Sequence, residues 1–163
     1  MKRGEIVVVA IIAIVVLGVM GRNVLRLNAP HEVDKGIPYY STASAALARD
    51  AMDIYRTQNC KNCHSLWTVR DMLESVPAPI LDGLGSLHTE EWFYQYFSAA
   101  NPQEILPSRL KQEFRMPSYA KLPENERRML ASYMASLKVQ DWYLEETKKA
   151  EYEKLTGKEY RHE

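Results

Sequence analysis

The stretch Cys60-Lys61-Asn62-Cys63-His64 (CKNCH) holds the only two cysteines of the 163-residue chain, with a histidine directly after the second. Thiols at this spacing lie about one helical turn apart, so both can face the same bound group. This is the attachment pattern of c-type haem, in which each thiol adds to one vinyl group of the porphyrin and the histidine binds the iron. We therefore expect one covalent haem c on Cys60, Cys63 and His64.

Paired cysteines also occur in structural zinc sites and in dithiol redox motifs. A zinc site needs two further cysteine or histidine ligands at matching spacing, and the remaining histidines are scattered at His31, His88 and His162. A thioredoxin-like pair belongs to a βαβ context, which the sequence does not indicate. Haem attachment is therefore the interpretation that the residues favour.

The sixth iron ligand is expected to be Met116, which lies in a loop between two predicted helices. A loop of this kind can cross the haem face opposite His64, and Pro117 biases Met116 toward an extended conformation. Methionines on apolar helix faces, such as Met52, are expected to fill gaps in the core. His88 remains an alternative second ligand. Ligation by methionine and histidine leaves no open iron position and predicts electron transfer, with no catalysis and no small-molecule substrate.

Pro79 lies in the turn-rich segment 76–88. A backbone carbonyl commonly orients a metal-binding histidine by accepting the proton of its other ring nitrogen. We expect the Pro79 carbonyl to play this part for His64, while a simple turn-forming role for the proline stays open.

Apolar residues at helical spacing predict an all-α fold for the middle of the chain. One expected helix begins after Ser41 or Thr42, a second after Thr89, and a third with Pro123 at its first position. No strand is predicted. The expected apolar faces comprise Ala48, Ala51, Met52 and Tyr55; Trp92, Phe93, Tyr96 and Phe97; and Leu130, Tyr133, Met134 and Leu137.

The first 27 residues begin with Lys2 and Arg3 and are uncharged from Ile6 to Gly21. This pattern predicts a transmembrane anchor at the short end of the usual length, with a cleavable signal peptide as the alternative. No small-x-small cleavage site follows the run, which favours the anchor. Because haem is attached to cysteines outside the cytoplasm, we expect a single-pass protein of the bacterial cytoplasmic membrane with the haem domain on the periplasmic side.

These observations divide the chain into an anchor, a linker, a haem domain and a tail. The linker is rich in turn-forming residues, and the tail is dominated by charge, which predicts a solvated helix. The formal net charge of zero gives no basic field for nucleic acid. The expected boundaries are 1–27 for the transmembrane anchor, 28–41 for the linker, 42–138 for the haem domain and 139–163 for the charged tail.

The order of helix, CxxCH motif, proline loop, aromatic helix, Met-Pro loop and final helix resembles class I cytochromes c. The chain looks most like the anchored monohaem subunit of C-family haem–copper oxidases, and is also similar to the cytochrome c subunit of bacterial nitric oxide reductase. The resemblance implies that Pro79 orients His64 and that Met116 binds the iron. It rests on Asp53-Ile54-Tyr55, Asn62-Cys63-His64-Ser65-Leu66, Pro79-Ile80-Leu81-Asp82-Gly83-Leu84-Gly85, Glu91-Trp92, Asn101-Pro102 and Met116-Pro117-Ser118-Tyr119.

The resemblance implies an electron-transfer subunit of a membrane respiratory complex, with redox proteins as partners and no enzymatic activity of its own. A free-standing anchored cytochrome that shuttles between complexes is the second hypothesis. An enzyme or sensor with an open haem position is the third, and the identity of the sixth ligand separates it from the other two.

Overall fold

The computed structural model describes residues 3–27, 35–67, 76 and 78–161, and for 3, 5–10 and 25–27 it describes the backbone only. The chain divides into two compact units, Met1–Gly36 and Ile37–Glu163, and each is described by itself. The first contains the helix α1 (Arg3–Leu27), whose side chains from Ile11 to Val24 are exposed. Within the described residues, no helix meets the length and hydropathy expected of a membrane span.

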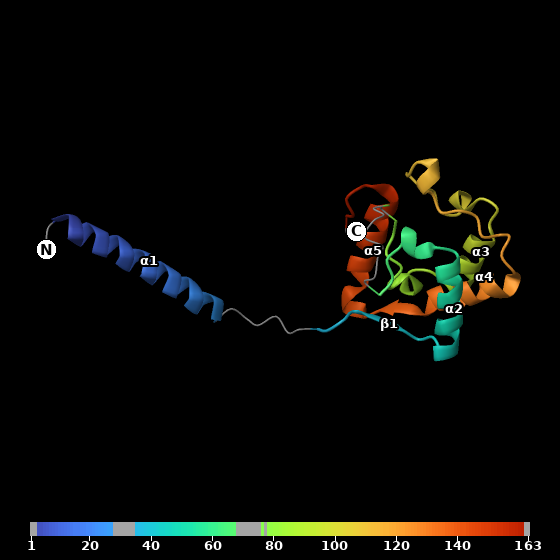
Figure 1. Ribbon diagram of the computed structural model, residues 1–163, viewed down its shortest axis with the longest axis horizontal. Coiled ribbons are helices and arrows are strands. Elements are labelled where there is room, and N and C mark those ends of the chain that lie inside the picture. The colour runs from blue at the N-terminus through green and yellow to red at the C-terminus, as the bar shows by residue number, and fades with distance from the viewer. Residues whose placement is uncertain (1–2, 28–34, 68–75, 77, 162–163) are drawn as a thin grey trace. The chain divides into compact units, whose positions relative to one another are not determined.

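The second unit is built on three helices, α2 (Ala45–Thr57), α3 (Glu90–Ser98) and α4 (Glu124–Ser136). Helix α4 packs against both α2 and α3 (Figure 1). The described part of the chain is thus mostly helical, which confirms the all-α class. The buried core consists of Ala51, Tyr55, Leu66, Leu84, Phe93, Phe97, Leu130, Ala131, Tyr133, Met134 and Leu137.

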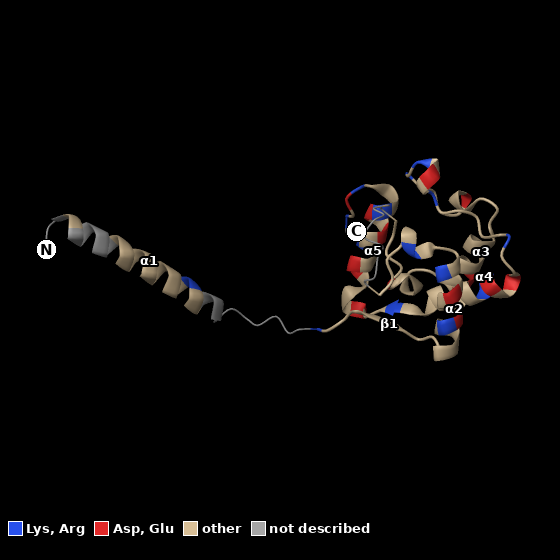
Figure 2. Ribbon diagram, viewed as in Figure 1, with Lys and Arg blue, Asp and Glu red and all other residues tan. Residues whose placement is uncertain are grey.

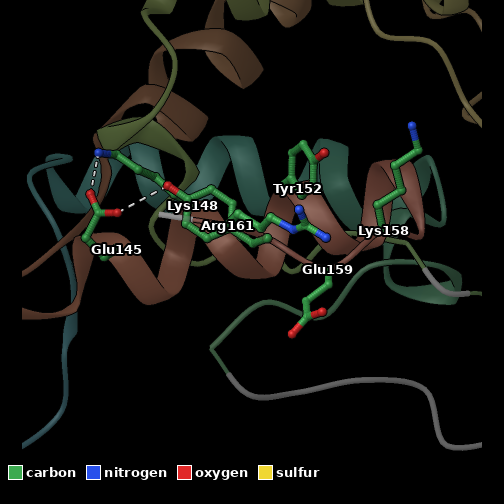
Figure 3. Close-up of a pocket in the computed structure, with 7 residues that line it drawn as sticks. Glu145, Lys148, Tyr152, Lys158, Glu159 and Arg161 are labelled. Atoms are coloured by element: carbon green, nitrogen blue, oxygen red, sulfur yellow. Dashed lines mark hydrogen bonds and ion pairs between the residues drawn. The ribbon is translucent and has the colours of Figure 1, made fainter. Parts of the chain in front are cut away.

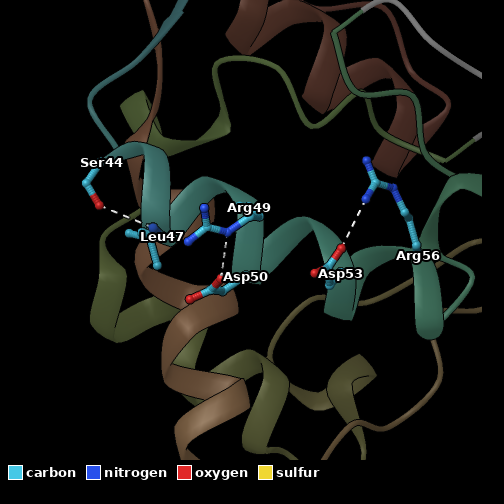
Figure 4. A network of polar contacts seen from close by, with 6 residues as sticks. All are labelled: Ser44, Leu47, Arg49, Asp50, Asp53 and Arg56. Carbon is cyan, nitrogen blue, oxygen red and sulfur yellow. Dashed lines mark hydrogen bonds and ion pairs between the residues drawn. The ribbon is translucent and has the colours of Figure 1, made fainter.

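Helix α2 begins later than the sequence predicted. Its N-cap is Ser44, whose hydroxyl accepts from the Leu47 amide at 3.2 Å (Figure 4). Ser41 and Thr42, the expected caps, instead contact Ser136: the two serine hydroxyls lie 3.1 Å apart, and the Thr42 amide donates to the Ser136 carbonyl at 3.0 Å. Ser41 and Thr42 therefore bond to Ser136, which is distant in the sequence, and do not cap the helix.

Helices α3 and α4 begin close to the predicted positions. The Thr89 hydroxyl caps α3 by accepting from the Trp92 amide at 3.2 Å, and Glu90 and Glu91 occupy the first turn, as expected. Pro123 precedes α4 and does not start it, because its ψ of 144° is extended. Proline fixes φ but leaves ψ free, so it suits either position.

A short antiparallel pair of strands was not predicted. Strand β1 (Tyr39–Ser41) pairs with β2 (Leu137–Val139), with Tyr40 opposite Lys138. The amide of Gln140 extends the pairing by donating to the Pro38 carbonyl at 2.8 Å. Three-residue strands are too short to show alternation in the sequence. As a result, the predicted linker ends inside the compact unit, while 28–34 lie outside the described residues.

The charged C-terminal tail is helical, as predicted, and most of its side chains are exposed or half-buried, but one face of it packs against the compact unit. It forms α5 (Leu144–Thr156), in which Thr147 is buried. Thr147, Glu151 and Leu155 are spaced four residues apart and share one face. Only one of them is apolar, so the inward face carries little hydrophobic signal among the many charges (Figure 2).

Candidate haem-binding site

The CxxCH motif follows directly on the end of α2. Asn59 adopts the left-handed conformation (φ 56°, ψ 30°), which ends the helical region and turns the chain into a short 3-10 helix, Cys60–Asn62. The amides of Cys63 and His64 both donate to the Cys60 carbonyl, at 3.2 and 3.0 Å. This single turn holds the two thiols and the imidazole in a fixed order on one side of the chain.

The side chain of His64 is held by a backbone carbonyl. Its Nδ1 lies 2.8 Å from the carbonyl oxygen of Pro79. Because a carbonyl can only accept, this contact requires the proton on Nδ1 and leaves the lone pair of Nε2 available to a metal. Burial lowers the pKa of His64, which also favours the neutral imidazole that a metal needs. The tyrosine hydroxyl of Tyr55 donates to the His64 carbonyl at 3.1 Å and fixes the backbone.

The loop that carries Pro79 is itself tightly attached to α4 and β2. At Gly85, an added Cβ would collide with the backbone of Met134 and Ala135, so only glycine allows this approach. The Lys138 ammonium donates to the Gly85 carbonyl, and the Val139 amide donates to the Ser86 hydroxyl at 3.0 Å. The loop that carries the Pro79 carbonyl is therefore held against α4 and β2.

Met116 lies outside regular secondary structure, in the loop between α3 and α4, and is half-buried. The amide of the Gln103 side chain donates to the Met116 carbonyl at 3.1 Å. After Pro117, the Ser118 hydroxyl donates to the Ala99 carbonyl at 2.7 Å, which ties the loop to the end of α3. These contacts bring Met116 against the core from the side of α3.

The predicted site residues line one cavity of about 330 Å³. Cys60, Cys63, His64, Pro79 and Met116 all contribute to its wall. Residues from α3, α4 and the proline loop supply a largely apolar lining that includes Leu81, Leu84, Phe93, Phe97, Leu130 and Met134. An apolar cavity with a few convergent polar groups is the usual form of a cofactor site.

Cys60 lies near a residue that sequence reasoning did not single out. Its sulfur is 4.0 Å from the hydroxyl of Tyr119, and burial raises the pKa of the Cys60 thiol while this contact opposes the rise. The two cysteines are not joined in a disulfide. Both thiols are therefore present for bond formation at the edge of the cavity.

His88, the alternative iron ligand, also lines the cavity but has another partner. Its Nε2 lies 2.7 Å from a carboxylate oxygen of Glu151 on α5, and its ring stacks on Trp92 with centroids 4.0 Å apart. The Glu151 contact was not anticipated because it joins residues on distant segments. Together with Leu155, which also lines the cavity, it makes the C-terminal helix part of the wall.

A wider hollow of about 890 Å³ lies between α5 and the C-terminal residues that follow it. Figure 3 shows Lys148, Tyr152, Lys158, Glu159 and Arg161 around it, with Lys148 paired to Glu145. It contains none of the cysteine, histidine or methionine side chains that could hold a haem. The larger of the two cavities is therefore not the candidate haem site. The smaller one is, because it contains the sulfur and nitrogen atoms that could hold the group.

The residues of the smaller cavity fit a haem c, because two thiols, a half-buried imidazole whose Nδ1 bonds a carbonyl, and a thioether are the donor set that this group requires. Among the described residues, no group of three or more His, Cys, Asp or Glu side chains is arranged to hold a metal ion. In comparisons with known proteins, no protein family, no curated protein and no solved structure matches this chain.

Proposed function

We propose that this chain is a c-type cytochrome that transfers single electrons through one covalently attached haem. The observation that carries the proposal is the convergence of Cys60, Cys63, His64 and Met116 on one apolar cavity, with Pro79 bonded to the histidine ring. His64 and Met116 would supply the histidine and methionine ligands that cytochromes c use.

In this proposal each residue has a defined part. Cys60 and Cys63 would form the thioether links, and Nε2 of His64 and the sulfur of Met116 would bind the iron. When bound, the haem supplies a one-electron couple. The apolar lining excludes water, and the Pro79 carbonyl holds the imidazole proton on Nδ1. If both ligands are bound, the iron would keep no open position, and electron transfer would be favoured over catalysis.

Covalent attachment is tested by producing the protein in a host that matures cytochromes c. We expect a haem-sized mass increment and haem staining that survives denaturing electrophoresis. Replacing both cysteines (Cys60→Ala with Cys63→Ala) should abolish the stain, while Asn62→Ala, inside the same motif, should keep it. A wild-type protein without covalent haem would refute the proposal.

We further propose that α1 anchors the cytochrome in the bacterial cytoplasmic membrane, with the haem domain in the periplasm. A helix of 25 residues is about 38 Å long at the usual rise per residue, and its sequence is uncharged from Ile6 to Gly21. Alkaline extraction of membranes should leave the full chain in the pellet, and a variant that starts at Gly36 should be released. Recovery of the full chain in the soluble fraction would argue against an anchor.

The proposed setting is a membrane respiratory complex in which this chain relays electrons between redox proteins. A free-standing anchored cytochrome is the second possibility, and both fit the same haem site. Purification of the full chain in mild detergent separates them: a stoichiometric membrane partner supports the subunit, and an isolated cytochrome supports the shuttle.

A further inference from the structure

The carboxyl group of Asp82 is buried in the compact unit, with only 3% of the residue exposed. Burial of a carboxylate is unfavourable unless hydrogen bonds compensate for the lost water. One such bond comes from the backbone amide of Trp67, which donates to Oδ1 of Asp82 at 2.8 Å. A buried acid this close to the haem-binding motif is unexpected for a residue that only forms a turn.

Trp67 has an unusual backbone conformation. Its φ of 52° lies in the left-handed region, which a bulky residue rarely adopts, and the conformation is unfavourable unless its surroundings enforce it. Two hydrogen bonds hold it: the amide bond to Asp82 and a bond from Nε1 to the Tyr133 hydroxyl at 3.2 Å. The Asp82 carboxyl therefore stabilises a strained residue three positions after His64.

Three hydrogen bonds join the segment 64–67 to the segment 79–82. The first is the His64 ring to the Pro79 carbonyl at 2.8 Å, and the second is the Leu81 amide to the Ser65 carbonyl at 3.0 Å. The Trp67 amide to Asp82 is the third. We refer to these contacts as the histidine bracket. Asp82 closes the bracket at the end away from the imidazole, so the two segments keep a fixed register.

The position of Asp82 is also fixed from outside the bracket. The next residue, Gly83, has a φ of 81°, and a Cβ there would lie 3.1 Å from Val139 and 3.2 Å from Thr147. These neighbours belong to β2 and to α5, which lie far from the CxxCH motif along the sequence. The backbone next to Asp82 is therefore packed closely against both elements.

We propose that Asp82 is a positioning residue for the iron ligand His64 and that its buried negative charge lowers the reduction potential of the haem. The inference rests on the proposed function, because it concerns the haem that His64 would bind. A negative charge in a low-dielectric interior stabilises the oxidised iron, which carries one more positive charge than the reduced iron. The hydrogen bonds of the bracket transmit the position of Asp82 to the imidazole.

The test compares two variants of the mature haem protein. Asp82→Asn keeps the size and an acceptor oxygen for the Trp67 amide but removes the charge, so we expect an unchanged proximal-ligand signature and a more positive reduction potential. Asp82→Ala removes both, and we expect a more positive potential together with shifted signals of the His64 ring protons in the NMR spectrum of the oxidised haem protein. A merely structural role would not separate the two variants in this way.

Asp53→Asn is the matched control, because Asp53 lies on α2 with its carboxylate mostly exposed and paired with Arg56. Its substitution should leave the potential almost unchanged, since water and salt screen an exposed charge. A shift in Asp82→Asn no larger than that in Asp53→Asn would overturn the electrostatic part of the proposal. Unshifted His64 ring signals in Asp82→Ala would overturn the positioning part.

Failure of this inference is distinguishable from failure of the proposed function. If the wild-type protein carries covalent haem and the Asp82 variants keep its potential and its ligand signature, only the role of Asp82 is refuted. If Asp82→Ala does not fold, Asp82→Asn still decides the electrostatic part, and Asp82→Ala combined with Trp67→Gly decides the positioning part. Glycine relieves the strain at this position, so His64 ring signals in this double variant that match those of Trp67→Gly alone would refute it.

Discussion

The two sides of the cavity differ in how firmly they are held. On the His64 side, the histidine bracket joins two segments, and Gly85, Ser86 and Lys138 attach the proline loop to β2 and α4. On the Met116 side, a long loop is joined to the helices chiefly by side-chain hydrogen bonds, namely Ser118 to Ala99, Arg127 to Ala120 and Arg109 to Lys154. The contacts on the His64 side are partly buried and include a glycine packed against the backbone of α4, whereas two of the three on the Met116 side are exposed to solvent.

This difference suggests how the proposed ligands would behave. Segments with many buried contacts open only when the whole domain unfolds, whereas loops with few contacts open locally at a smaller free-energy cost. Phe114, two residues before Met116, is about half exposed, and Ile105 earlier in the same loop is also partly exposed. We therefore expect changes on the His64 side to reduce global stability, and changes on the Met116 side to alter ligation first.

The largest effect is expected for Gly85→Ala, on the His64 side. The new Cβ would collide with the carbonyl groups of Met134 and Ala135, which belong to the backbone and cannot rotate away. Overpacking of this kind should lower the free energy of unfolding by about 3 kcal/mol, measured by chemical denaturation of the haem protein. Gly18→Ala is the control, since no atom lies within 4 Å of its added Cβ. Equal stability of the two variants would show that the proline loop is not rigidly supported.

A smaller loss of stability, but a larger change in the spectrum, is expected for Met116→Ala. Truncation of this half-buried side chain should cost about 2 kcal/mol. It should also remove the near-infrared absorption band of a methionine–iron bond and let small external ligands reach the iron. Met52→Ala, on the apolar face of α2, provides a comparison in which stability falls and the band is kept. Persistence of the band in Met116→Ala would mean that another residue binds the iron.

The smallest effect is expected where α5 closes the wall, at Glu151→Ala. Loss of the contact with His88 should lower the free energy of unfolding by about 1 kcal/mol, because the pair is partly exposed to solvent. We expect the methionine–iron band to remain. Loss of the band in Glu151→Ala, with its return when His88→Ala is added, would show that Glu151 keeps His88 away from the iron. It would also show that Met116 is displaced from the iron more easily than expected. Glu146→Ala, at an exposed position of the same helix, is the control.

Several local features were predictable because neighbouring residues encode them. The cap at Thr89 and the buried face of Leu130, Tyr133 and Met134 were both predicted and are confirmed. The residues of the expected haem site were chosen from local spacing and from the position of Met116 beside Pro117, and they line one cavity. The helical class followed from the same periodicity. All these features depend on sequence separations of a few residues, over which helical geometry is regular.

Other features depended on partners far away along the chain. Ser41 and Thr42 were expected to cap a helix, yet they contact Ser136 and border the unexpected strand β1. Asp82 was noted only as part of a proline loop, and its burial depends on the placement of Trp67 and on the packing around Gly83. No short-range pattern distinguishes a buried aspartate from one in a solvated turn.

The amino-acid order alone specified the chemistry of the site, since the spacing of two thiols and an imidazole is a local property of one turn. It also specified which faces of the central helices are apolar. The assembled fold decided that the charged tail would close the cavity, because the inward face of α5 gains its partners, His88 and the packing around Thr147, only after folding. A contact between distant segments forms only when the whole chain has folded, so the spacing of apolar and polar residues within one segment does not predict it.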